Sequence, residues 1–212
     1  MRKLLTFTPA ALLLLTVSGA VHAADANLTI KGTILPAACT PSISNGGVID
    51  YGSIDSNSLN VNKVTNLQTM PLTISIACTS PIKVGFKVAD NRPGTHNETG
   101  PRFGLNTDNS GNNIGYYFLA PEQESFRIDG EAGRLASVNG ATYQEASIIG
   151  PNGLTYTASL ISKPSGPITE LPFATNMIFD VGIRTTIYPK NNLDLANEIN
   201  LDGSATLSVV YL

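Results

Sequence analysis

Apolar and polar residues alternate with a period of two in several segments of this chain. Residues 72–79 are the clearest example in the first half, where every second side chain is apolar and the series ends at Cys78. The same alternation marks residues 84–88, 177–185 and 205–212. Side chains that recur every second residue lie on one face of a β-strand. We therefore predict strands here, with one face, Cys78 included, directed toward a core.

Shorter apolar runs predict further strands between turn signals such as Asn45-Gly46-Gly47 and Asn152-Gly153. These runs lie at residues 48–54, 114–119, 125–128 and 155–161. Residues 89–113 are polar and predict a long exposed loop, whereas residues 129–152 carry only weak signals. Long amphipathic helix patterns are missing. Many short strands separated by turns indicate an all-β sandwich.

The N-terminus has the three parts of a cleaved secretory signal. Arg2 and Lys3 are followed by an apolar run over residues 10–17 and by small residues that end at Ala23. We place the cleavage after Ala23, so that residues 1–23 are the signal peptide; a cut after Ala26 is the alternative. The apolar run is too short for a membrane anchor. We therefore expect an exported protein without membrane insertion.

Charge narrows the range of partners. Removing Arg2 and Lys3 with the signal leaves eleven basic and sixteen acidic residues, a net charge near −5, and no basic run follows. Neither nucleic acid nor an anionic membrane would be attracted to such a surface. We expect no nucleic-acid partner.

The chain contains two cysteines, Cys39 and Cys78. In an exported protein an even pair most often forms a disulfide, and no C-x-x-C motif suggests a metal or redox site. We therefore predict a Cys39–Cys78 disulfide, which would close a loop of about 40 residues.

The sequence offers little for catalysis. After cleavage His96 is the one remaining histidine, and no G-x-S-x-G motif is present. Residues 106–113 resemble a calcium loop in composition but lack the spacing of an EF-hand, and a polar turn is the simpler interpretation. We expect a protein that is not an enzyme, with no catalytic residue, metal or cofactor.

Both ends of the mature chain are alternating segments. At the start, one face carries Leu28, Ile30, Gly32 and Ile34. At the end, one face carries Ala205, Leu207, Val209 and Tyr211. A strand at the edge of a sheet exposes unpaired backbone groups, and one way to cover them is to add a strand from another chain.

Four features occur in an order that resembles the chaperone–usher pilins of the type 1 and P-pilus kind. Gly32 precedes Cys39 by seven residues, residues 48–54 combine an acid, an aromatic residue and a glycine, Cys78 ends an alternating strand, and Tyr211 is next to last. The style is closest to predicted beta-fimbrial subunits. Two details differ: the glycine nearest the C-terminus is Gly203 rather than one some fourteen residues from the end, and the N-terminal extension is short.

The resemblance implies an immunoglobulin-like β-sandwich that lacks its last strand, over residues 36–212, preceded by a donor-strand extension over residues 24–35. A periplasmic chaperone would pair a strand with residues 205–212. At the outer-membrane usher, residues 24–35 of a neighbouring subunit would replace it, with Leu28, Ile30 and Ile34 in pockets and Gly32 where no side chain fits. The protein would then be a fimbrial subunit at the cell surface, in a homo- or heteropolymer that contributes to adhesion, as shaft, adaptor or tip.

The alternative is a complete sandwich that uses both terminal segments in its own sheets. The protein would then be a self-contained secreted binding module for a carbohydrate or protein ligand, and it would fold alone as a monomer.

Overall fold

The computed structural model describes residues 29–32, 38–139, 142–160 and 171–212. The chain divides into two compact units, residues 1–35 and residues 36–212. The predicted signal peptide, together with Leu28 and Ile34, lies outside the described residues. In the first unit, residues 29–32 form no hydrogen-bonded strand, and Ile30 is 88% exposed.

The second unit is built from antiparallel strands, with four short 3-10 turns and no α-helix in its described part. None of the described segments is a helix of the length and apolarity needed to cross a membrane. The strands are β1 (Cys39–Ile43), β2 (Thr65–Asn66), β3 (Met70–Ile82), β4 (Val84–Asp90), β5 (Phe103–Gly104), β6 (Gly115–Pro121), β7 (Arg127–Ile128), β8 (Glu131–Asn139), β9 (Thr142–Glu145), β10 (Thr155–Leu160), β11 (Ala174–Ile187) and β12 (Ala205–Tyr211). The turns are η1 (Ser44–Gly47), η2 (Ser56–Ser58), η3 (Gln123–Ser125) and η4 (Lys190–Asn192).

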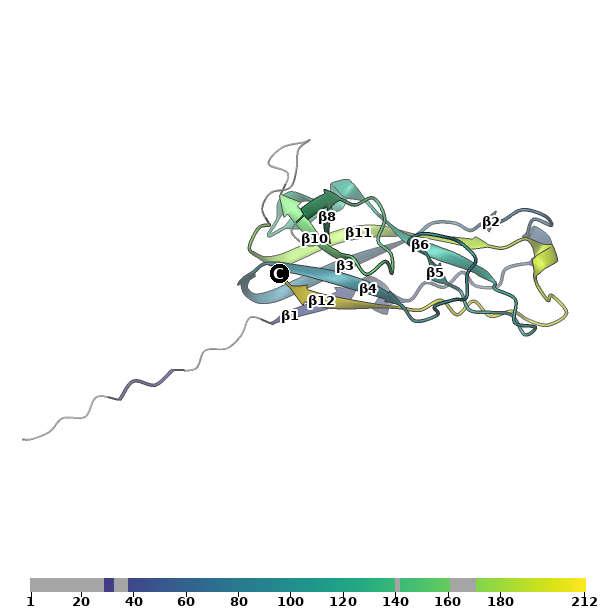
Figure 1. The fold of residues 1–212 in the computed structure, drawn as a ribbon, viewed down its shortest axis with the longest axis horizontal. Helices are drawn as coiled ribbons and strands as arrows, with labels where there is room; N and C mark the ends of the chain where they lie inside the picture. Colours follow the sequence, from purple (N-terminus) through teal and green to yellow (C-terminus); the bar gives the residue numbers. More distant parts are fainter. Residues whose placement is uncertain (1–28, 33–37, 140–141, 161–170) are drawn as a thin grey trace, which may run out of the picture. The chain divides into compact units, whose positions relative to one another are not determined.

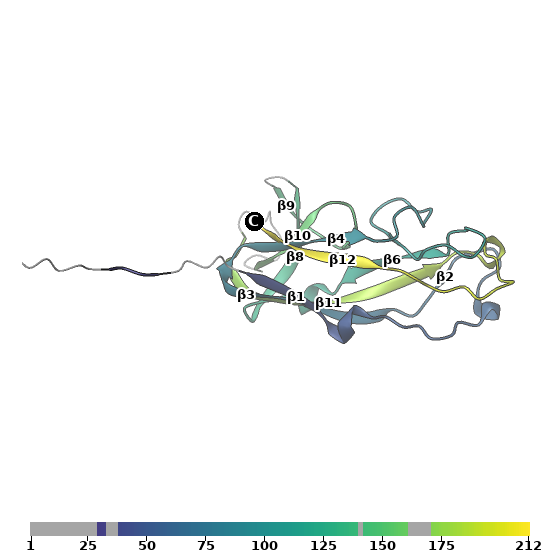
Figure 2. The same ribbon diagram turned by 90° about the horizontal axis from the view of Figure 1, so that it is seen from below.

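The strands form two layers, and Figure 2 shows β4, β10 and β12 above β1, β3 and β11. Successive hydrogen-bonded neighbours follow the order β1-β3-β11-β7-β8-β10-β4-β12. The β7–β8 hairpin carries this path from one layer to the other. β6 pairs with β11 and so extends the layer that contains β1, β3 and β11 (Figure 1). The fold is therefore the all-β sandwich that the alternating segments predicted, and it is consistent with the immunoglobulin-like form that the resemblance implied.

The strongly alternating segments are confirmed as strands β3, β4, β11 and β12, and β3 continues through Ser80-Pro81. Two details of the prediction are wrong. Residues 48–54 form no paired strand, and residues 89–113, expected to be a long exposed loop, contain the short strand β5, with Phe103 fully buried. Residues 129–152, which carry only weak signals, contain β8 and β9. The sequence of β8 alternates weakly, but the strand pairs with β10 on one side and β9 on the other. Its tertiary neighbours, rather than its own pattern, make it a strand.

Aromatic rings fill one part of the space between the layers. Phe86 of β4 lies 5.4 Å from Phe179 of β11, measured between ring centroids, and Phe179 stacks on Phe126 at 4.4 Å. Tyr156 of β10 extends the column from Phe86 at 5.7 Å. All four rings are fully buried. Burial of such large rings joins the two layers into one core.

The predicted disulfide is confirmed. Cys39 of β1 and Cys78 of β3 stand directly opposite one another, with their Cα atoms 4.0 Å apart. Both are half-buried against the core, and Cys78 shares the inward face of Leu72, Ile74 and Ile76, as the alternation predicted. The disulfide therefore fastens β1, an end strand of the sandwich, to its neighbour.

Candidate functional site

The two strands that end the path of pairing, β1 and β12, lie beside one another without pairing among the described residues. Every pairing along the path is antiparallel, so β1 and β12 run in opposite directions. We call the gap between these two edges, and between the segments that continue them, the seam. A strand placed in it would have a backbone edge on each side.

The open edge of β12 is defined by its pairing with β4. Ser204 C=O accepts from Asn91 N–H at 3.0 Å, and Leu212 N–H donates to Lys83 C=O at 3.0 Å. In an antiparallel pair such contacts recur at every second residue, so the even-numbered residues of β12 direct their backbone groups toward β4. The odd-numbered residues then direct theirs toward the seam. These are Ala205, Leu207, Val209 and Tyr211, the residues predicted for strand addition.

The edge of β1 offers fewer groups. Thr79 N–H donates to Ala38 C=O at 2.9 Å, so the same alternation turns the backbone groups of Cys39, Pro41 and Ile43 toward the seam. Pro41 has no N–H to donate. The Cys39 N–H already donates to the Tyr211 hydroxyl at 3.1 Å. Of the two edges, β12 is therefore the better template for a backbone ladder.

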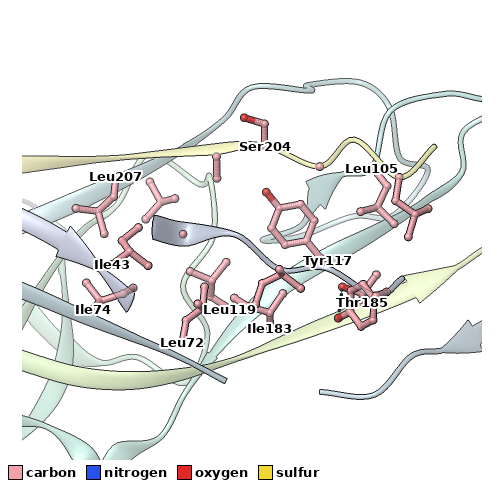
Figure 3. A pocket seen from close by; sticks show the side chains of 17 residues that line it. Ile43, Leu72, Ile74, Leu105, Tyr117, Leu119, Ile183, Thr185, Ser204 and Leu207 are labelled. Atoms are coloured by element: carbon pink, nitrogen blue, oxygen red, sulfur yellow. Dashed lines mark hydrogen bonds between the residues drawn. The ribbon is translucent and has the colours of Figure 1, made fainter. Parts of the chain in front are cut away.

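An apolar groove opens along the seam, with a cavity of about 270 Å³. Ile43 of β1 and Leu207 of β12 stand on opposite rims, and β3, β6 and β11 supply the floor (Figure 3). The apolar floor side chains are Leu72, Ile74, Tyr117, Leu119 and Ile183. A groove flanked by free backbone edges and floored by aliphatic side chains has the features that bind an extended peptide through main-chain pairing and alternate side-chain pockets.

Gly203 lies where the β12 rim meets Tyr117 of the groove floor. A β-carbon on Gly203 would lie 2.8 Å from Tyr117 Cε1 and 3.0 Å from Leu105 Cδ2. The Tyr117 ring is buried and stacks on Phe103 at 5.0 Å between centroids, so it has little room to move. The absence of a side chain therefore lets the chain before β12 approach the groove floor.

The groove continues into a second, larger cavity of about 690 Å³, which shares Ile49, Tyr51 and Leu201 with the first. Its far rim is the segment before β12, which sequence reasoning overlooked. The signal was present, because the period-two pattern of β12 already begins at Leu193. Its apolar members before β12 are Leu193, Leu195, Ile199 and Leu201.

Residues 48–54, expected to be a strand, instead form the near rim of this second cavity. The Tyr51 hydroxyl donates to Thr185 Oγ1 at 2.9 Å, and burial raises the pKa of Tyr51 against the opposing effect of that bond. Gly52 has φ +62°, a conformation that favours glycine, and its N–H donates to Asp50 Oδ1 at 2.7 Å. The local turn at Gly52 and the long-range bond from Tyr51 to β11 hold this segment along the groove, where it pairs with no strand.

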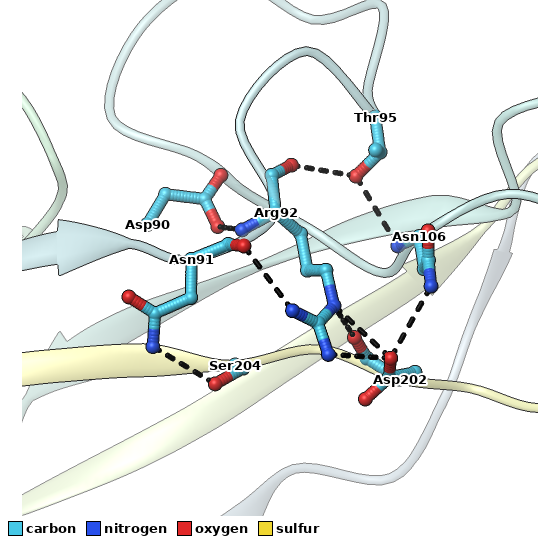
Figure 4. A network of polar contacts seen from close by, with 7 residues as sticks. All are labelled: Asp90, Asn91, Arg92, Thr95, Asn106, Asp202 and Ser204. Carbon is cyan, nitrogen blue, oxygen red and sulfur yellow. Dashed lines mark hydrogen bonds and ion pairs between the residues drawn. The ribbon is translucent and has the colours of Figure 1, made fainter.

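A polar network fixes the rim at the start of β12 (Figure 4). Arg92, in the loop after β4, forms an ion pair with Asp202 at 2.6 Å, and Asn106 donates to the same carboxylate oxygen at 3.2 Å. Asn91 donates to Ser204 Oγ at 2.9 Å. The residues on either side of Gly203 are thus held by bonds to the loop after β4 while Gly203 faces the groove.

Asp108 anchors the far rim. It is only 7% exposed and accepts from Asp194 N–H at 2.7 Å and from the backbone N–H groups of Ser110 and Asn112. Burial alone would raise the pKa of Asp108, but the hydrogen bonds from Asp194, Asn112 and Ser110 outweigh it and lower the pKa to about 2. Residues 106–113 therefore form a polar turn that uses its own carboxylate to hold residue 194.

The predicted site residues lie in different surroundings. Ala205 and Leu207 line the groove, Val209 packs against the core, and Tyr211 reaches β1. For the predicted donor segment, Gly32 has open space around the position of a β-carbon, and Ile30 is exposed. Leu28 and Ile34 lie outside the described residues, so the donor role of this segment stays a prediction.

Fold and seam together define a disulfide-bonded antiparallel β-sandwich with two end strands, each paired on one side only among the described residues. Residues 28–117, which include β1, the near rim and the floor strand β3, match the family described as "Protein of unknown function (DUF1120)". The uncharacterized protein YhcF of Escherichia coli K12 is 30% identical over 227 residues, covering 90% of this chain and 92% of YhcF. Protein GltF of the same strain is 38% identical over 80 residues, 36% of this chain and 32% of GltF. The chain therefore belongs to the same family as YhcF.

Proposed function

We propose that the protein is a structural subunit of a chaperone–usher-assembled bacterial fimbria that polymerises by donor-strand exchange. The observation that carries the proposal is the seam, in which the two end strands leave free backbone edges above an apolar groove. A strand from a periplasmic chaperone would fill the seam first. The N-terminal extension of a neighbouring subunit, residues 24–35, would then replace it at the usher.

The strand directions constrain how the seam is filled. Because β1 and β12 run in opposite directions, any inserted strand is parallel to one edge and antiparallel to the other. Its main ladder forms with Ala205, Leu207, Val209 and Tyr211, because Pro41 removes a donor from the edge of β1. Pairing with both edges would close the path of strands and cover the open edges of β1 and β12.

The extension has the side chains for this groove. Leu28, Ile30 and Ile34 fall on one face, and burying three aliphatic side chains at roughly 2 kcal/mol each contributes about 6 kcal/mol. Gly32, on the same face, would suit a place where the groove leaves no room for a side chain. The added ladder of hydrogen bonds would then make the joint between subunits slow to open.

The test is periplasmic expression with a matching chaperone, comparing the mature chain with a variant that lacks residues 24–33. Unboiled samples are separated on a denaturing gel. We expect a heat-sensitive ladder from the intact chain and a single chaperone-bound subunit from the truncated chain. A lone, soluble, folded monomer formed without any chaperone would show a complete sandwich and would favour the self-contained binding module.

A further inference from the structure

A single side chain bridges the two end strands. The Tyr211 hydroxyl accepts the Cys39 N–H at 3.1 Å, and it is the one hydrogen bond between β1 and β12 among the described residues. Tyr211 is 52% exposed, so burial does not hold its ring in place. The end of the seam near the disulfide is therefore closed by one exposed side chain, which can rotate away.

The far end of the seam is closed differently. There Lys190 N–H donates to Asn60 C=O at 2.9 Å and Asn191 N–H donates to Val61 C=O at 3.2 Å. Asn191 Nδ2 also donates to Asn62 Oδ1 at 2.7 Å. Two backbone bonds and one side-chain bond join residues 60–62 to residues 190–191 there, whereas a single hydrogen bond to a side chain joins the two strands at the Tyr211 end.

The hydrogen bond from Cys39 N–H to Tyr211 resembles the backbone bond that Cys39 would make to an inserted strand. Cys39 N–H points away from β3 into the seam, where an inserted strand would offer a backbone carbonyl oxygen. With no strand in the seam, the phenolic oxygen of Tyr211 accepts the Cys39 N–H in place of a backbone carbonyl oxygen. Tyr211 also belongs to the edge of β12 on which an inserted strand would pair.

We propose that Tyr211 is a latch: its hydroxyl substitutes for a carbonyl of the missing strand and is displaced when a strand enters the seam. The inference rests on the proposed function, because it assumes that the occupant is an extended segment such as residues 24–35 of a second copy. The latch keeps the empty seam closed at the disulfide end and slows strand entry there.

The first measurement is hydrogen exchange at the Cys39 amide. The full mature chain, with its disulfide intact, is diluted from urea and pulse-labelled within seconds of refolding. Removing one hydrogen bond in Tyr211→Phe should speed exchange at Cys39 by roughly two- to tenfold. Tyr116→Phe is the matched control, because Tyr116 lies on the opposite face of β6 from the groove-lining Tyr117.

The second measurement is uptake of a fluorescent peptide of residues 24–35, added directly after refolding. Tyr211→Phe should take up the peptide faster than the unmodified chain by a similar factor, and both should show the same Cys39 protection once filled. Unchanged Cys39 exchange in Tyr211→Phe would overturn the latch even if the peptide binds. Altered exchange without peptide uptake by either chain would support the latch as a contact and count against the proposed function.

Discussion

Gly203 shows how one residue shapes the groove. Replacing it with alanine places a β-carbon 2.8 Å from the Tyr117 ring, which Phe103 holds from the other side. We expect Gly203→Ala to lower the free energy of unfolding by about 1–3 kcal/mol through overpacking and to weaken uptake of the donor peptide. Chemical denaturation and peptide titration measure the two effects. Ser208→Ala, on the exposed face of β12, is the control; equal behaviour of both variants would show that the groove tolerates a side chain here.

Asp108 gives a pH dependence with a definite sign. Its folded-state pKa, about 2, lies below the ordinary value of 3.8, so its stabilisation is present above about pH 4 and is lost as the pH falls toward 2. We expect Asp108→Asn to be less stable at pH 7 by about 1–3 kcal/mol, because an amide cannot accept all the N–H groups that the carboxylate accepts.

The difference between Asp108→Asn and the unmodified chain should shrink as the pH approaches 2, measured by urea unfolding over a pH series. Glu124→Gln, an exposed carboxylate in η3, is the control and should show no comparable change. A difference that stays constant from pH 7 to pH 2 would contradict the assignment of this titration to Asp108.

At the scale of elements, β1 is a short strand held by one neighbour and one disulfide. It has five residues, most of them exposed, and pairs with β3 alone among the described strands. Its role is to form a rim of the groove rather than to fill the core. What fastens β1 to β3 therefore also fixes the width of the seam.

Replacing both cysteines with alanine should lower the free energy of unfolding by about 4 kcal/mol on a chain-entropy estimate for a loop of this length. Amide exchange in β1 should increase more than exchange in β4, since only β1 loses its fastening. Denaturation and exchange mass spectrometry measure both. Ser42→Ala, which removes only the 2.8 Å bond to Ser75, should leave β1 protected; equal loss in that variant would show that side-chain bonds, not the disulfide, hold the rim.

At the scale of the whole molecule, the aromatic column and the groove floor belong to one continuous core. Phe86, Phe126, Tyr156 and Phe179 stack between the two layers. Beside them the groove opens between β1 and β12 above floor side chains that are themselves buried, and none of the described strands lies between these two edges. A chain with such a groove should aggregate or lose stability when nothing fills the seam.

The amino-acid sequence was sufficient to predict the all-β fold class, the disulfide and the strands with the strongest alternation. Those features follow from local pattern, because a period of two assigns side chains to faces wherever a segment lies. It also marked Ala205, Leu207, Val209 and Tyr211 as one face of a terminal strand.

The three-dimensional fold alone sets where the path of pairing ends, because hydrogen-bonded neighbours along β1-β3-β11-β7-β8-β10-β4-β12 are mostly distant in sequence. It made β8 a strand through its partners, turned residues 48–54 into a rim, and brought Tyr211 to Cys39. Residues 193–201 alternate as β12 does, yet they line a cavity without joining a ladder. Alternation along a segment determines which face of a strand each side chain lies on. Whether the backbone is paired depends instead on the strand beside it, and the seam exists because none of the described strands lies between β1 and β12.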